Sequence, residues 1–316
     1  MMDLKLKIAV CSRSFSRHTK LRQELLSKYK NVTFNECGEQ LEGKNLIEFL
    51  KNHDKAITAL EKIDENILSQ LPELKAIGKY GVGLDMIDMN AMNKFGVRLG
   101  WVPGVNRRSV SELTLSMMIS MFRHVHIANS QVQSGIWRQI IGRELSGSTV
   151  GVLGCGHVGK DVIKLLRPFG CRILVNDILD YPSFYEEYDV QRVTLSQLMA
   201  LSDVVSIHIP LNSATRGILC AKMLSLMKAS AILINTARGG LVDESMLKNM
   251  LINNRLSGAA FDVFDSEPPA DTELLSLPNF ISTPHIGGSS EEAVLAMGLS
   301  AINGLEHNSV PQVDTK

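Results

Sequence analysis

The sequence predicts an α/β protein built from two doubly wound parallel-sheet domains. Short runs rich in β-branched residues alternate with amphipathic stretches, and this alternation occurs twice along the 316 residues. A glycine-rich motif with the spacing G-x-G-x-x-G begins at Gly154, in the middle of the chain. A chain of this length, 45% hydrophobic, can bury two cores, so two domains are expected.

The first alternating series occupies the first third of the chain. Thr19–Lys28 and Asn66–Gln70 have helical patterns and lie between apolar runs. The predicted strands of this series are Leu6–Val10, Val32–Asn35, Ala56–Ala59, Lys75–Lys79 and Val97–Leu99. Strands that alternate with helices favour parallel pairing, so this third predicts one open parallel sheet.

The second series begins at "STVGVLG" (148–154) and predicts a second parallel sheet. Its further strands are predicted in "CRILVND", "DVVSIHIP", "AILINTA", "LSGAAFDV" and "NFISTPH". Between the two series, Arg107–Ser134 is predicted as one long helix. Its apolar positions recur every four residues at Leu113, Met117, Met121 and Val125, and Gly135 follows as a C-terminal cap.

The end of the chain is expected to return to the first domain. Glu291–Leu305 has a helical pattern and follows the last predicted strand. The stretches rich in glycine or proline at Gly100–Gly104 and Gly287–Gly288 are predicted as the two crossings and as hinges. The predicted domains are therefore residues 1–100 with 289–316, and residues 101–288.

Composition and charge narrow the class of partner. Lys+Arg and Asp+Glu both number 33, so no net field attracts nucleic acid or an anionic membrane. The five cysteines are dispersed and form no CxxC pair, which predicts neither a disulfide framework nor a metal site. No apolar run has the length of a signal peptide or a membrane span. A small-molecule or protein partner and a cytoplasmic location are expected.

The glycine motif predicts a dinucleotide site. Gly154, Gly156 and Gly159 follow a β-branched strand and open a helical stretch, Val158–Leu166. The first glycine permits a tight turn, the second lets backbone approach a diphosphate, and the third lets helix and strand pack closely. The diphosphate then rests at the helix N-terminus. Asp177 ends the next strand, where a carboxylate accepts hydrogen bonds from ribose hydroxyls, and no arginine follows directly, so NAD is favoured over NADP.

Three ionisable residues follow three successive strands after this motif. Arg238 lies in "INTARGG", Glu267 in "DVFDSEPP" and His285 in "STPHIGG". Each alone has a structural alternative: a cap for carbonyls, a solvated loop residue, or an ordinary loop histidine. The carboxyl ends of parallel strands share one edge of a sheet, where ligands bind, so the three side chains are expected at one site. An imidazole titrates close to neutral pH and suits acid/base work.

Seven motifs in order make the sequence resemble the D-isomer-specific 2-hydroxyacid dehydrogenase family over nearly its whole length. They are "KYGVGLDMID" (79–88), "PGVNRRSVSELT" (103–114), "VGVLGCGHVGK" (150–160), "HIPLNSATRG" (208–217), "LINTARGGLVDE" (233–244), "GAAFDVFDSEPP" (258–269) and "TPHIGG" (283–288). The resemblance implies a Rossmann NAD-binding domain inserted in a flavodoxin-like substrate, or lid, domain. It also implies hydride transfer between nicotinamide and C2 of a small anionic 2-hydroxy or 2-oxo acid.

The resemblance implies a role for each matching residue. Arg238 would bind the substrate carboxylate and polarise the C2 oxygen, His285 would be the general acid/base, and Glu267 would orient it. Lys79, Val82 and Gly83 would contact substrate, and Asp262 would hydrogen-bond the nicotinamide amide. The implied cofactor-binding set is Gly154, Gly156, His157, Val158, Gly159, Asp177, His208, Pro210, Thr215, Thr236, Ala237, Asp262, Gly287 and Gly288.

Within the family the first two motifs look most like phosphoglycerate dehydrogenases. 3-Phosphoglycerate is therefore the first expected substrate, with Lys79 reaching its phosphate, although a solvated lysine is the alternative. Hydroxypyruvate or glyoxylate reduction is the second expectation. A non-catalytic, dinucleotide-sensing binding protein on the same scaffold is a third. The resemblance also implies a homodimer, with Arg107–Ser134 and the arm after it as contacts.

Overall fold

A computed structural model describes residues 3–312, and the chain divides into two compact units. One unit comprises Met1–Asn106 with Ser290–Lys316, and the other Arg107–Ser289. The sequence placed the crossings after residues 100 and 288, whereas the units separate after residues 106 and 289. The segment after residue 100 stays with the first unit because the Trp101 indole donates to the carbonyl of Val82, at 3.1 Å.

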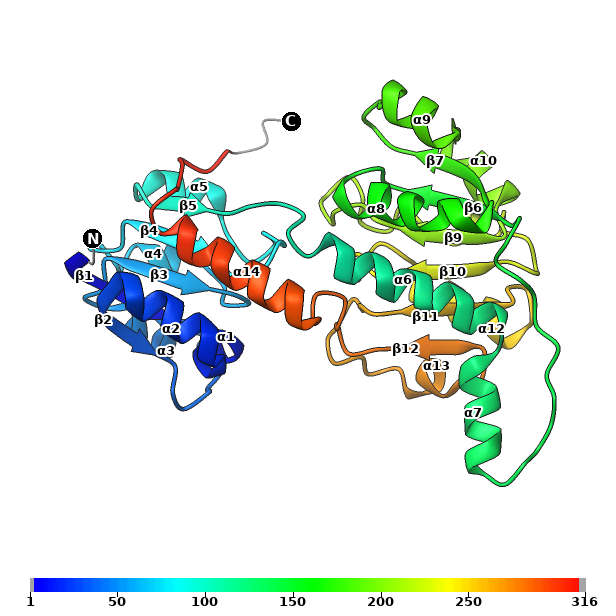
Figure 1. The fold of residues 1–316 in the computed structure, drawn as a ribbon, viewed down its shortest axis with the longest axis horizontal. Coiled ribbons are helices and arrows are strands. Elements are labelled where there is room, and N and C mark those ends of the chain that lie inside the picture. Colours follow the sequence, from blue (N-terminus) through cyan, green and yellow to red (C-terminus); the bar gives the residue numbers. More distant parts are fainter. Residues whose placement is uncertain (1–2, 313–316) are drawn as a thin grey trace. The chain divides into compact units, whose positions relative to one another are not determined.

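The first unit is built on a five-stranded sheet in which every pairing is parallel (Figure 1). Its order is β2-β1-β3-β4-β5. The strands are β1 (Asp3–Val10), β2 (Tyr29–Phe34), β3 (Lys55–Thr58), β4 (Ala76–Lys79) and β5 (Arg98–Gly100). The helices are α1 (Arg13–Arg17), α2 (Thr19–Lys28), α3 (Gly43–Leu50), α4 (Glu65–Leu68), α5 (Met89–Lys94) and α14 (Glu291–Gly304). All five predicted strands are present, and α2 coincides with its predicted range.

Both faces of this small sheet are buried, as a doubly wound sheet requires. Along β1 and the residue after it, Ile8 and Val10 belong to one apolar cluster, while Ala9 and Cys11 belong to the other. The chain end closes the first of these faces. Helix α14 packs on β4 and β5 and adds Ala301 and Ile302 to its core, so the first unit contains both ends of the chain (Figure 1).

The second unit carries a seven-stranded parallel sheet of order β12-β11-β10-β9-β6-β7-β8 (Figure 1). The strands are β6 (Thr149–Leu153), β7 (Arg172–Asn176), β8 (Val190–Arg192), β9 (Val204–Ile207), β10 (Ile232–Asn235), β11 (Gly258–Phe261) and β12 (Phe280–Ser282). The helices are α6 (Arg107–Phe122), α7 (Val125–Gln133), α8 (His157–Leu166), α9 (Pro182–Tyr188), α10 (Leu195–Leu201), α11 (Ala221–Leu224), α12 (Glu244–Ile252) and α13 (Thr272–Ser276), with a 3-10 turn η1 (Arg167–Phe169). The strand order reverses between β6 and β9, which is where such sheets bind dinucleotides.

The prediction of one long helix over Arg107–Ser134 is wrong, because this range forms two helices, α6 and α7. His124 has φ of 54°, a left-handed conformation that interrupts the helix between α6 and α7. The four-residue period holds through Met121, which is buried, and fails at Val125, which is half-exposed. Helix α7 buries none of its residues, so the apolar repeat in the sequence continues past the point where the helix contacts the core.

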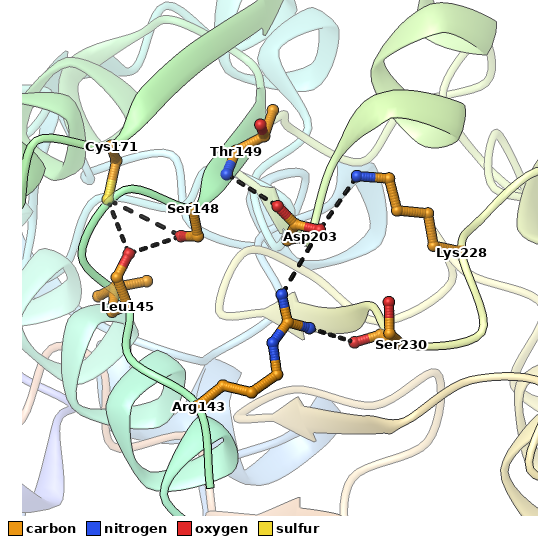
Figure 2. Close-up of polar contacts among 8 residues, drawn as sticks. All are labelled: Arg143, Leu145, Ser148, Thr149, Cys171, Asp203, Lys228 and Ser230. Carbon is orange, nitrogen blue, oxygen red and sulfur yellow. Dashed lines mark hydrogen bonds and ion pairs between the residues drawn. The ribbon is translucent and has the colours of Figure 1, made fainter.

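The segment after α7 is tied to the amino-terminal edge of the large sheet by Asp203 (Figure 2). The Asp203 carboxylate accepts from the Thr149 amide at 3.0 Å and from the Lys228 ammonium at 3.0 Å. The guanidinium of Arg143 lies 3.7 Å from it and also donates to the carbonyl of Ser230. Burial by itself raises the pKa of Asp203, but these donors outweigh burial and hold that pKa below its usual value.

Replacing Asp203 with asparagine is expected to lower the free energy of unfolding at pH 7 by about 1.5–3 kcal/mol, the usual worth of a charge-assisted hydrogen bond. Because the folded pKa of Asp203 is depressed, its stabilisation is complete above the ordinary carboxyl pKa, near 4, and is lost as pH falls through the folded value. Denaturant melts of both proteins from pH 7 downward measure this. The Asp265→Asn variant, which breaks an exposed pair with Arg216, is the control. A penalty equal at all pH values would contradict the prediction.

No helix among residues 3–312 combines the length and apolar character needed to cross a membrane. The same residues contain no group of three or more His, Cys, Asp or Glu side chains arranged to hold a metal ion.

Candidate active site

The glycine motif forms the turn between β6 and α8. Gly154 has φ of 98°, and a Cβ there would lie 2.6 Å from the carbonyl oxygen of His208, on the loop after β9. A Cβ on Gly159 would lie 2.0 Å from the carbonyl oxygen of Gly154. Packing therefore requires both glycines, whereas a Cβ on Gly156 would meet nothing within 4 Å.

The open space at Gly156 fits a dinucleotide diphosphate. Gly156 is the N-cap of α8, and no side chain caps the helix there. The first amides of a helix have no partner within the helix and favour an anion, so His157 and Val158 would present theirs to a diphosphate. The residues present thus fit the group that the sequence predicts.

Asp177 lies directly after β7, beside this turn. Its carboxylate accepts from the Cys155 amide at 2.5 Å and from the Leu179 amide at 2.8 Å. These bonds fix the carboxylate at the carboxyl edge of the sheet, next to the glycine turn. That is the position from which an acidic side chain reaches ribose hydroxyls in this fold.

His208, directly after β9, is held neutral. Although the residue as a whole is only partly buried, its Nδ1 is shielded from solvent and has no hydrogen-bond partner among the described residues. Its Nε2 lies 2.8 Å from the Ser206 hydroxyl. Burial lowers the pKa of His208 to about 3, so the ring is uncharged at neutral pH. His208 can therefore line a cofactor site but does not supply a proton.

The loop after β10 positions Arg238. Asn235, which is buried, donates from its side-chain amide to the carbonyl of Arg238 at 2.8 Å and accepts from the Ala237 amide at 3.1 Å. Arg238 is partly buried and donates to the Ala237 carbonyl at 2.7 Å. Thr236 lies on this loop too, with its hydroxyl 2.8 Å from that of Thr114 on α6. Sequence reasoning missed Asn235, although a polar residue closing an apolar strand was a usable signal.

Asp262 follows β11 and holds the loop that carries His285. Its carboxylate accepts from the Thr283 hydroxyl at 2.5 Å, the Ile286 amide at 2.8 Å and the Gly287 amide at 2.7 Å. Its carbonyl accepts from the His285 amide at 2.9 Å. Asp262 is almost fully buried, so these bonds are shielded from water. The structure thus gives it a positioning role; contact with the nicotinamide amide stays a prediction.

His285 and Glu267 form a hydrogen-bonded pair. His285 Nδ1 lies 2.8 Å from Glu267 Oε2, while Glu267 Oε1 accepts from the Phe264 amide at 3.1 Å. His285 has φ of 54°, a left-handed conformation costly for a residue with a Cβ and maintained here by the bonds to Asp262. With Nδ1 donating to the carboxylate, Nε2 is left to exchange a proton with a ligand.

The three strands β12, β11 and β10 are adjacent in the sheet. Arg238 follows β10, Glu267 lies in the loop after β11, and His285 follows β12. Their loops therefore leave the same edge of one sheet, as the sequence predicted from chain order. A cation, a carboxylate and an imidazole at this edge can bind an anionic substrate and move a proton beside the dinucleotide turn.

The predicted substrate residues of the first unit lie at the end of β4 and in the loop after it. Lys79 is 4% exposed and its ammonium donates to the carbonyl of Ala59, in the loop after β3. Val82 accepts from Trp101, and Val82 and Gly83 are both partly exposed. The solvated lysine considered from the sequence is therefore wrong, because burial and a backbone bond hold this side chain.

The fold and the glycine turn define a Rossmann domain of the dinucleotide-binding class. Residues 115–287 match the family model "D-isomer specific 2-hydroxyacid dehydrogenase, NAD binding domain". The chain belongs to the D-isomer-specific 2-hydroxyacid dehydrogenase family, and NAD is the cofactor of its Rossmann domain.

Relatives extend the match beyond that domain. A hydroxypyruvate reductase of Thermotoga maritima is 34% identical over 84% of this chain and 87% of its own length. A D-3-phosphoglycerate dehydrogenase of Methanocaldococcus jannaschii is 35% identical over 88% of this chain but 54% of its own length. The chain thus spans about half the length of that dehydrogenase. A solved structure of a putative family member from a Polaromonas species superposes with a TM-score of 0.87, at 28% identity over 95% of each chain.

Proposed function

We propose that the protein is an NAD-dependent D-2-hydroxyacid dehydrogenase that moves hydride between nicotinamide and C2 of a small 2-hydroxy or 2-oxo acid. The observation that carries this proposal is the hydrogen bond of 2.8 Å between His285 and Glu267, whose loops lie at the same edge of the sheet as the loop of Arg238. The glycine turn with open space at Gly156 supports dinucleotide binding beside it. Hydride donors of this class need a protein acid/base, because the chemistry of the ring supplies no proton.

Each side chain has a distinct task in the reductive direction. NADH, when bound, supplies the hydride to C2. Arg238 binds the substrate carboxylate with its forked guanidinium and directs the C2 carbonyl toward His285. His285 gives a proton from Nε2 to the carbonyl oxygen, and Glu267 stabilises the imidazolium that must exist beforehand. In the oxidative direction the same nitrogen takes the hydroxyl proton.

For the substrate, we propose a small 2-oxo acid without a second anionic group, such as hydroxypyruvate or glyoxylate. Lys79, on which the expectation of a phosphate largely rested, is buried and already donates to Ala59. The same loop carries Glu61, whose carboxylate accepts from the Ala59 amide at 2.6 Å and would repel a phosphate. The near full-length match to a hydroxypyruvate reductase agrees with this choice. 3-Phosphoglycerate, supported by other relatives, is the second candidate.

A panel of 2-oxo acids with and without a 3-phosphate tests the proposal. We expect kcat/KM for hydroxypyruvate or glyoxylate to exceed that for 3-phosphohydroxypyruvate. In the Lys79→Ala variant, phosphorylated and unphosphorylated substrates should then respond alike. A preference for the phosphorylated acid, lost selectively in Lys79→Ala, would establish the second candidate instead. Tight NADH binding with no oxidation by any acid in the panel would identify a dinucleotide-sensing protein.

We further propose that the protein forms a homodimer through α7 and the segment after it. This region exposes large apolar side chains, with Trp137 at 90% and Ile141 at 95% of their full exposure. Exposed apolar patches of this kind mark association sites, and the family resemblance implies a second copy as the occupant.

Light scattering after gel filtration tests the dimer. The joint substitution of Trp137 and Ile141 by glutamate is expected to halve the molecular mass, because both side chains would lie in the interface. Leu201→Glu, at the end of α10, alters an exposed apolar residue elsewhere and should leave the mass unchanged. A wild-type protein that is already monomeric at tens of micromolar would exclude the proposal.

The cysteines support, as a proposal, a reducing compartment such as the cytoplasm. All five are free thiols, of which Cys37 and Cys220 are exposed. Cys155, within the dinucleotide turn, is buried, and burial raises the pKa of its thiol to about 11. It therefore stays protonated at neutral pH. Free exposed thiols persist where the surroundings keep them reduced.

A further inference from the structure

An arginine lies beside Asp177 although none follows it closely in the sequence. Strand β8 runs parallel to β7 at the edge of the sheet, and its last residue, Arg192, pairs with Val175. One guanidinium nitrogen of Arg192 donates to the carbonyl of Asp177 at 3.3 Å. Another lies 3.2 Å from the carboxylate of Asp180. The sheet thus brings a cation to the end of β7, where sequence reasoning found none.

This cation stands where dinucleotide-binding folds distinguish NAD from NADP. The residue that ends the second strand of the motif approaches the adenosine ribose, an acidic side chain there accepts from the ribose hydroxyls, and a nearby arginine accommodates a 2′-phosphate. Here both elements coexist. The carboxylate of Asp177 is fixed by the Cys155 and Leu179 amides, and Arg192 is fixed to the backbone of the same residue.

The acidic residues Asp177 and Asp180 lie close to Arg192 and disfavour an added anion. Arg192 pairs with the carboxylate of Asp180 and donates to the backbone carbonyl of Asp177, and its side chain is 44% exposed, so a ligand can reach it. An exposed ion pair adds little stability, so a phosphate could compete with Asp180 for the guanidinium. The pKa of the nearby Tyr185 responds to the same charges. Burial is the largest cause that raises this pKa, to about 12; negative charges that include Asp177 and Asp180 raise it further, and Arg192 opposes them.

The other nearby cation is already engaged with aromatic rings. The ammonium of Lys160, on the first turn of α8, lies 3.4 Å from the centre of the Tyr181 ring and 5.5 Å from that of Phe184. A cation over an aromatic face is held there by the ring quadrupole. Lys160 serves in the experiment as the alternative phosphate contact.

We propose that Arg192 is a specificity-determining residue of the adenosine site, positioned to bind a 2′-phosphate and prevented from doing so by Asp177 and Asp180. The preference for NAD then rests on two carboxylates and not on the lack of a cation. Removing those charges, without adding any arginine, should convert the site toward NADP.

The test measures ligand binding and needs no turnover, so it is independent of the substrate assignment. Dissociation constants for NADH and NADPH, from nucleotide fluorescence, and for 5′-AMP and 2′-AMP, from calorimetry, are compared among variants. In Asp177→Asn with Asp180→Asn, we expect NADPH and 2′-AMP to bind at least about tenfold more tightly than to the wild type, the worth of one charge-assisted hydrogen bond. Asparagine keeps one acceptor oxygen, which can serve the Cys155 amide, and loses the acceptor of the Leu179 amide, so the NADH affinity of the double variant reports whether the turn is preserved.

Adding Arg192→Gln to that double variant should abolish the gain. The matched control, Arg172→Gln, removes one positive charge from the start of β7, where Arg172 bonds Gln191, and should preserve the gain. A gain that survives Arg192→Gln would assign the phosphate to another cation, such as Lys160, and overturn the proposal. No gain at all, with NADH binding intact, would overturn it equally.

Asp180→Asn alone provides a second route if the double variant binds no nucleotide. Asp180 is 53% exposed and its ion pair with Arg192 lies on the surface, so the single change should leave the fold intact. It is expected to improve the affinity for 2′-AMP relative to 5′-AMP, and Arg192→Gln should reverse that shift. An unchanged ratio of the two affinities would contradict the proposal.

Discussion

Replacing His285 with alanine is expected to lower kcat for NADH-dependent 2-oxo acid reduction by about 10²- to 10⁴-fold, the usual contribution of a general acid/base. In the proposed reaction the imidazole is the proton donor, and its Nδ1 is already hydrogen-bonded to Glu267 at 2.8 Å. Water would have to replace it as the proton donor. Steady-state rates with saturating NADH measure the loss.

NADH binding separates this effect from damage to the fold. The dissociation constant of NADH should change little in His285→Ala, because the glycine turn lies on other loops. Glu267→Gln keeps a hydrogen-bond acceptor for Nδ1 but removes the charge that stabilises an imidazolium, so a smaller loss in kcat is expected. Turnover of His285→Ala within a few fold of the wild type would refute the assignment of the acid/base.

Replacing Arg238 with glutamine is expected to lower kcat/KM by about 10²- to 10⁴-fold. Two charge-assisted hydrogen bonds to the substrate carboxylate, each worth about 1.5–3 kcal/mol, account for a loss of that size. Arg238→Lys should recover only part of it, because an ammonium keeps the charge but lacks the fork that binds both oxygens. The measurement is the dependence of initial rate on 2-oxo acid concentration.

Arg255→Gln is the control for the loss of one positive charge, because Arg255 is an exposed residue after α12. It should leave kcat/KM unchanged within a few fold, and NADH should bind all three variants with wild-type affinity. A substrate KM in Arg238→Gln equal to that of the wild type would show that another group binds the carboxylate.

Several features of the site could be predicted because they depend on local chain geometry. Glycine is needed at Gly154 and Gly159 because backbone passes within contact distance there, and Gly156 leaves the open space that a diphosphate would fill, so this spacing was informative without a structure. The order of Arg238, Glu267 and His285 after successive strands was equally informative. Parallel strands joined by right-handed crossovers put the ends of neighbouring strands at one edge.

Other features could not be predicted, because they depend on what packs nearby. The apolar period of α6 continues in the sequence past Phe122, but His124 adopts a left-handed conformation and α7 leaves the core. Lys79 looked available to a phosphate, yet it is buried and bonded to Ala59. Neither the residue type of Lys79 nor the apolar repeat of the helix predicts which groups pack against them.

The sequence by itself determined the class of this protein: two parallel α/β units, a dinucleotide turn and an ordered set of three reactive side chains. Tertiary structure alone decided how the charges near them are used. In the folded protein Asp262 fixes the loop of His285 through hydrogen bonds. Arg192, on β8, contacts Asp177, which lies 15 residues earlier in the chain. The physical reason is range. Turn geometry and strand alternation depend on a few neighbouring residues in the chain. The partner of a charged side chain is instead the group that the fold brings within a few ångströms of it, which can be far away in the sequence.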